Sequence, residues 1–158
     1  MKDPLLEIYL EDHFASAQGA LELVRRVERE NEGTELGEQV TDLRTEMERD
    51  VDTLSRVMSA VGVERDRLKD AAAWLAEKLG RFKRNGSVTS YSPLSRVEEL
   101  ELLSSAVTAK RALWETLDET RPAGVSVEFK EMIAFADQQA RKLHELHRRA
   151  VAIAFSPV

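Results

Sequence analysis

Apolar residues recur every three or four positions along most of this chain, which is the spacing of one face of an α-helix. The pattern runs through four long segments, at residues 4–30, 35–61, 93–119 and 127–155. On the second of them, for example, Leu43, Met47 and Leu54 share one face. The spacing therefore predicts an all-α protein built from four long amphipathic helices.

Helix-ending residues mark short joints within each half of the chain. Gly33 suits the left-handed position after a helix, and Thr34 suits the cap that begins the next one. Arg121–Gly124 interrupts the second half with Pro and Gly, and Ser126 is expected to cap the last helix. Short joints favour antiparallel neighbours, so the pattern predicts two helical hairpins.

The middle connection, residues 63–92, is much longer. Its own apolar positions predict a short helix over residues 64–79, ended by Gly80 and followed by a loop. Ser92 suits the cap before a helix that begins at Pro93. Because such a connection can cross from one end of a bundle to the other, we expect the second and third long helices to run parallel. The whole chain, residues 1–158, has the size of a single domain.

Composition narrows the classes of function. The chain has no cysteine, which excludes disulfides and thiolate metal sites and fits a cytoplasmic protein. The net charge of −6 argues against non-specific nucleic-acid binding, because that needs a cationic face. No apolar run approaches the roughly 18 residues of a membrane span, and the first residues lack the apolar core of a signal peptide. We therefore expect a cytoplasmic protein without membrane association.

Each long helix carries a charged residue inside its apolar series. These residues are Asp12, Asp50, Lys110 and Asp137. Levels matched from the predicted joints place all four near the middle of the bundle, where the Lys110 ammonium would neutralise carboxylates that are costly to bury. In the alternative arrangement Lys110 lies at the boundary, with its stem on the apolar surface and its ammonium in water. The sequence leaves both arrangements open.

Three segments resemble a known family. Tyr9–His13 lies where ferritin-like proteins carry a metal-binding Glu on their first helix. Leu54–Gly62 and Ala112–Leu117 resemble the second-helix and third-helix segments of the YciE/YciF-type bacterial ferritin-like proteins. The resemblance implies a ferritin-like four-helix bundle with a long crossover that carries a short extra helix. Di-iron members of the superfamily use a Glu from each of two helices and a Glu-x-x-His from each of the other two.

That metal-binding motif is degenerate in this chain. No Glu-x-x-His occurs, because His13, His144 and His147 all lack a Glu three residues earlier. The sequence thus predicts no dinuclear site, no catalytic residue and no cofactor. An atypical carboxylate site for iron or manganese stays open as an alternative. Its candidate ligands are Asp12, Glu46, Asp50, Glu101 and Asp137.

Three other features are candidates for binding. One compact basic run would suit an anion or an acidic partner, or else is a solvated loop. Its residues are Lys78, Arg81, Lys83 and Arg84. His144 and His147 have the i, i+3 spacing of a divalent-metal pair, although three arginines surround them. The apolar tail, residues 152–158, is expected to pack on its own bundle, with packing on a second copy as the alternative.

The predicted function is a ferritin-like structural or interaction module, acting as a homodimer and not as an enzyme. The sequence has no nucleophile–base pairing and no Gly-rich phosphate loop. Two alternatives stay open: the carboxylate–metal protein described above, and a protein that binds a small molecule in a cavity between its helices.

Overall fold

The computed structural model describes residues 3–63 and 91–156, and these form four α-helices and no strand. The helices are α1 (Pro4–Glu30), α2 (Glu35–Ala60), α4 (Pro93–Thr120) and α5 (Phe129–Ala154). The all-α prediction is confirmed, and the first three helices begin and end within one residue of the expected positions. The short helix and the loop expected over residues 64–90 lie outside the described residues. None of the described helices is long and apolar enough to cross a membrane.

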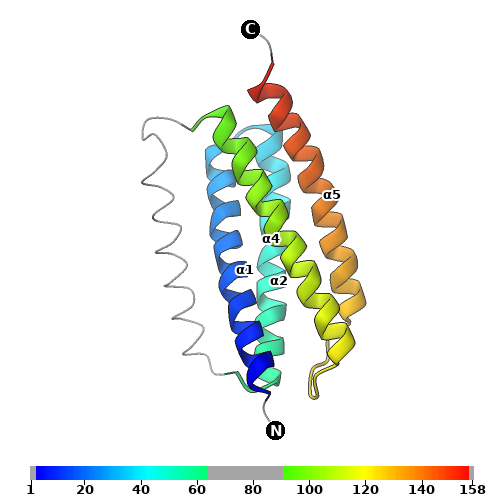
Figure 1. Cartoon of the computed structure of the whole chain (residues 1–158). Coiled ribbons are helices and arrows are strands. Elements are labelled where there is room, and N and C mark those ends of the chain that lie inside the picture. Colours follow the sequence, from blue (N-terminus) through cyan, green and yellow to red (C-terminus); the bar gives the residue numbers. More distant parts are fainter. Residues whose placement is uncertain (1–2, 64–90, 157–158) are drawn as a thin grey trace.

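The described helices pack side by side in a bundle, and they run in two opposite directions along it (Figure 1). α1 and α5 run one way, and α2 and α4 run the other way. Around the bundle the order of neighbours is α1, α2, α5, α4, so that α2 and α4 lie across the core from each other. α2 ends and α4 begins at opposite ends of the bundle, as the length of the middle connection predicts.

The core is a column of apolar side chains drawn from α1, α2, α4 and α5. Trp114 is fully buried, and its ring stacks on Phe129 with 6.3 Å between the ring centres. Leu10, Leu54 and Leu143 are also buried. Each such leucine stabilises the fold by roughly 1.5–3 kcal/mol on leaving water, so the apolar periodicity decides which face of each helix points inward.

Side-chain caps begin the first three described helices. The side-chain oxygens of Asp3, Thr34 and Ser92 accept backbone N–H groups of the first turn that follows, which confirms the caps predicted at Thr34 and Ser92. A cap of this kind is worth about 1 kcal/mol, because it satisfies N–H groups that have no partner within the helix.

The beginning of α5 differs from the prediction. The helix begins at Phe129, two residues later than expected, and Ser126 does not cap it. Val125 and Val127 pack against the core, which keeps the chain before Phe129 out of the helix. Burial of two β-branched side chains thus outweighs the local preference for a serine cap.

The turn between α1 and α2 is tied to the start of α4. Asn31 is buried, and its Nδ2 donates to the carbonyl oxygen of Val27 at 2.7 Å and to the hydroxyl of Tyr91 at 3.1 Å. The same turn brings α2 close to the end of α1: a Cβ at Gly37 would lie 2.1 Å from the carbonyl oxygen of Asn31. Only glycine fits there, because the atom that blocks a side chain belongs to the backbone.

We expect Gly37→Ala to destabilise the protein by about 1–3 kcal/mol in urea unfolding, since the overlap forces the backbone to move. Alanine would otherwise stabilise a helical position by about 1 kcal/mol relative to glycine, so the sign of the change is informative. The matched control is Gly33→Asn, because Gly33 has a φ of +76° with no atom near its missing Cβ, and Asn tolerates that conformation. An equal or greater stability of Gly37→Ala would contradict the close approach.

Candidate functional site

The polar centre of the bundle is the ammonium of Lys110. Its Nζ donates to Oδ2 of Asp50 on α2 and to Oε1 of Gln139 on α5. The Lys110 side chain is 12% exposed and that of Asp50 is 9% exposed, so the pair is nearly removed from water. The snorkelling arrangement that the sequence left open is therefore not the one adopted.

Gln139 completes this contact. Its side-chain Nε2 donates to Asp50 Oδ2 at 2.9 Å, while its Oε1 faces the Lys110 ammonium. Gln139 is only 2% exposed. An amide that donates to the carboxylate with one atom and accepts from the ammonium with the other satisfies both charged groups at once. We call the three residues Asp50, Lys110 and Gln139 the central triad.

Helical spacing puts the central triad on the inward faces. Lys110 lies three residues after Val107 and four before Trp114, both of which are buried. Gln139 likewise lies three residues after Ala136 and four before Leu143. Side chains three and four residues apart share a helix face, so each polar group of the triad is carried into the core by its apolar neighbours.

The electrostatics of the triad are a balance between burial and pairing. Burial lowers the pKa of the Lys110 amino group from its ordinary value, and the carboxylate of Asp50 opposes that shift, with a smaller contribution from Glu46. Desolvation disfavours a charged ammonium, whereas a neighbouring carboxylate favours it. Asp50 is therefore what allows a lysine to occupy this position.

A small cavity adjoins the triad between α1, α2 and α4. Its volume is about 30 Å³, enough for one or two water molecules. Asp50, Lys110 and His13 line it together with small side chains of α1 and α4. Burial lowers the pKa of His13, an effect that the charge of Asp12 partly offsets. His13 also contacts the ring of Tyr9 edge-on, with 4.5 Å between the ring centres.

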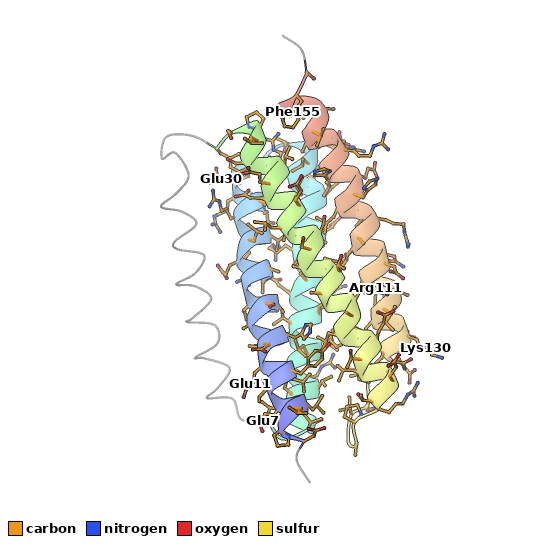
Figure 2. All side chains as sticks on the ribbon, viewed as in Figure 1. Glu7, Glu11, Glu30, Arg111, Lys130 and Phe155 are labelled. Atoms are coloured by element: carbon orange, nitrogen blue, oxygen red, sulfur yellow. The ribbon has the colours of Figure 1, made fainter. Side chains whose placement is uncertain are left out.

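The structure does not place Asp12 and Asp137 with Lys110. Asp12 is exposed, because it lies midway between the buried Leu10 and Phe14 and so points to the opposite side of α1. Asp137 accepts from Nε of Arg111 at 2.7 Å, and Figure 2 shows Arg111 where α4 and α5 meet. The predicted position of Asp137 along the bundle axis was nearly correct. The predicted direction of its side chain was wrong. Asp137 lies two residues before the inward-facing Gln139, and two residues along a helix correspond to about 200° of rotation.

The candidate carboxylate ligands are dispersed in the described part of the chain. Glu46 pairs with Lys142, and Glu101 lies 3.0 Å from Nε2 of His147. Within residues 3–63 and 91–156 no three acidic or histidine side chains form a group that could hold a metal ion. His147 lies beside Glu101, whereas His144 is exposed and belongs to no such group in that part of the chain.

The sequence also singled out a basic run and an apolar tail as candidate contact surfaces. The basic run of Lys78, Arg81, Lys83 and Arg84 lies outside the described residues. The tail was expected to pack on its own bundle, but Ile153 is 57% exposed and Phe155 is 64% exposed. Figure 2 shows Phe155 at the end of the bundle, where α5 has passed the helices that would cover it.

A second buried polar cluster was not predicted. Glu99 is buried, with Oε1 2.9 Å from Nε of Arg26, and the Arg96 guanidinium lies 5.6 Å from the centre of the Tyr91 ring. Burial raises the pKa of Tyr91 to about 12. A sequence signal did exist, since Glu99 lies four residues before the buried Leu103 and so shares its face.

Comparison of this chain with protein-family models, with curated proteins and with solved structures gives no match. The interpretation of the site therefore rests on its own geometry.

We expect Lys110→Met to destabilise the protein on the order of 3–5 kcal/mol near neutral pH, because it keeps much of the volume but leaves Asp50 buried without a cation. The loss should shrink at acid pH, where the stranded carboxylate can take up a proton. Urea unfolding from pH 4 to 8 measures both effects. The control is Lys142→Met, which breaks the partly exposed pair with Glu46 and should cost about 0–1 kcal/mol. A neutral Lys110→Met over this whole range would contradict the account of the triad.

A second prediction concerns Glu99, whose pKa is raised mainly by burial, against the opposing charge of Arg26. Glu30, Glu98 and Tyr91 are its other ionisable neighbours. Because the folded state holds this proton above the ordinary value of 4.5, stability should fall as the pH rises from 4.5 through the folded pKa. The difference in unfolding free energy between the wild type and Glu99→Gln isolates this effect, and the exposed Glu119→Gln serves as control. A free-energy difference that does not fall with pH in that window would show that burial does not control the pKa of Glu99.

Proposed function

We propose that this chain is a ferritin-like protein in which a lysine-centred contact stands in place of a dinuclear metal centre, and that it acts as a structural or interaction module. The observation that carries the proposal is the position of Lys110. Its ammonium lies at the point where a carboxylate oxygen of α2 and an amide oxygen of α5 converge. Oxygen atoms so arranged are ligands for a cation, and the chain supplies that cation itself.

Several other carboxylates support a structural role, since cations of the chain pair with them. Arg111 joins Asp137 of α5 to Glu115 of its own helix, at 2.7 and 2.5 Å. Arg149 of α5 lies 2.9 Å from Glu35 at the start of α2. Each exposed pair adds little stability, but together they specify which helices are neighbours.

The interaction that we propose is the formation of a homodimer. Leu94, Ile153 and Phe155 are large apolar residues that remain exposed where α4 begins and α5 ends. Contact with a second copy of the chain would remove them from water, and isologous dimers are the commonest assemblies of soluble proteins.

Metal analysis tests whether the lysine-centred contact stands in place of a dinuclear metal centre. Protein purified without chelators and incubated with Fe²⁺, Mn²⁺ or Zn²⁺ should retain less than a stoichiometric amount after removal of free metal, as measured by elemental mass spectrometry. Stoichiometric metal in the wild type that disappears in Asp50→Asn would instead favour the carboxylate–metal alternative.

Sedimentation tests whether the chain forms a homodimer. The 17.9 kDa chain should sediment as a dimer, and Phe155→Asp should shift it toward monomer. Leu5→Asp is the matched control, because Leu5 is equally apolar and 77% exposed but lies at the opposite end of the bundle. A monomeric wild type, or equal dissociation by both variants, would remove this end of the bundle as the interface.

A further inference from the structure

The partners of the Lys110 ammonium are positioned by contacts of their own. Gln139 donates its Nε2 to Asp50 Oδ2, and this holds its Oε1 toward the ammonium. Both side chains are buried among apolar neighbours on α2 and α5, helices that do not carry Lys110. Asp50 and Gln139 would therefore keep their hydrogen bond, and their two acceptor oxygens would keep their positions, if the lysine side chain were shorter.

The site also has space and a route from solvent. The cavity of about 30 Å³ adjoins both Asp50 and Lys110. On the α1 and α4 side its wall includes small residues as well as His13, Leu113 and Trp114, and two of the small ones, Ser16 and Ala109, are exposed at the surface. The cavity therefore has an edge toward solvent between these two helices, at Ser16 and Ala109.

We propose that Asp50, Gln139 and this cavity form a receptor for a primary ammonium group, of which Lys110 is the tethered occupant. A primary ammonium supplies a positive charge for the carboxylate and three N–H donors, of which two match Asp50 Oδ2 and Gln139 Oε1. Its alkyl chain would lie along the apolar wall formed by Leu54, Leu113 and Trp114. The inference rests on the structural role proposed for the triad and adds the class of ligand that the site selects.

The size of the ligand follows from the lysine side chain. Lys110→Ala removes Cγ, Cδ, Cε and Nζ, which are the heavy atoms of n-propylammonium. That ion should therefore bind best, with methylammonium weaker because it fills less of the space. n-Propanol has no charge and tetramethylammonium has no N–H donor, so neither should bind.

The experiment measures the Tm of Lys110→Ala at pH 7 during titration with each of these four compounds at constant ionic strength. n-Propylammonium should raise the Tm saturably and recover much of the loss caused by the substitution, with the wild type unaffected. If Lys110→Ala is unfolded at this pH, the same titration followed by far-UV circular dichroism should restore helix. No selective response to n-propylammonium in either measurement overturns the receptor.

One further variant separates specific from non-specific binding of the ammonium. In Lys110→Ala/Asp50→Asn the carboxylate charge is gone, and the response to n-propylammonium should be lost. A response retained there would indicate non-specific binding and would overturn the proposal. If Lys110→Ala is destabilised but not rescued, the structural role of the triad stands and the receptor fails. If Lys110→Ala is as stable as the wild type, both fail.

Discussion

The contact of Lys110 with Asp50 and Gln139 is the constraint on which the arrangement of this bundle depends. It joins α4 to α2 and α5 with directional hydrogen bonds inside an apolar core. Apolar side chains tolerate small rotations and shifts of a helix, but a buried charge that loses its partner costs several kcal/mol. A rotation of α4 by one residue would carry Lys110 about 100° away from both partners. The triad therefore selects one set of helix orientations among those that the apolar stripes alone would permit.

The cluster around Glu99 acts at the end of the bundle where α1 turns into α2 and α4 begins. Asn31 joins the turn to Tyr91, and Arg26 of α1 pairs with Glu99 of α4. These contacts hold α4 at its first turns, while the central triad holds it at mid-length. Because Glu99 is buried and burial raises its pKa, the stability that this cluster contributes depends on pH. The exposed pairs between α4 and α5 contribute less, since water and salt screen them.

The two buried clusters support the structural role proposed above. Lys110 pairs with Asp50, and Glu99 pairs with Arg26, so these charged groups of the core bind other groups of the chain. The cavity beside the triad is small and leads to a charge pair of the protein itself. The features turned toward solvent include ion pairs on the helix faces and apolar residues at both ends of the bundle, among them Leu5 and Phe155. Such surfaces are suited to contact with another protein or a second copy.

The sequence by itself determined the helices, because the three- and four-residue spacing of apolar positions and the capping residues act locally. It also determined that α2 and α4 run parallel, since the connection between them is long. It placed Asp50 and Lys110 within the apolar series of their helices, but it left open whether the ammonium is buried. Only the tertiary structure decided the partners of Lys110. Gln139 shares the inward face of Ala136 and Leu143, but that position alone does not show that its amide joins Asp50 to Lys110. Asp12 and Asp137 had suitable levels along the bundle but point elsewhere, because an ion pair depends on the rotation of each helix about its axis. That rotation is set by the packing of all four described helices together, which no single segment of sequence contains.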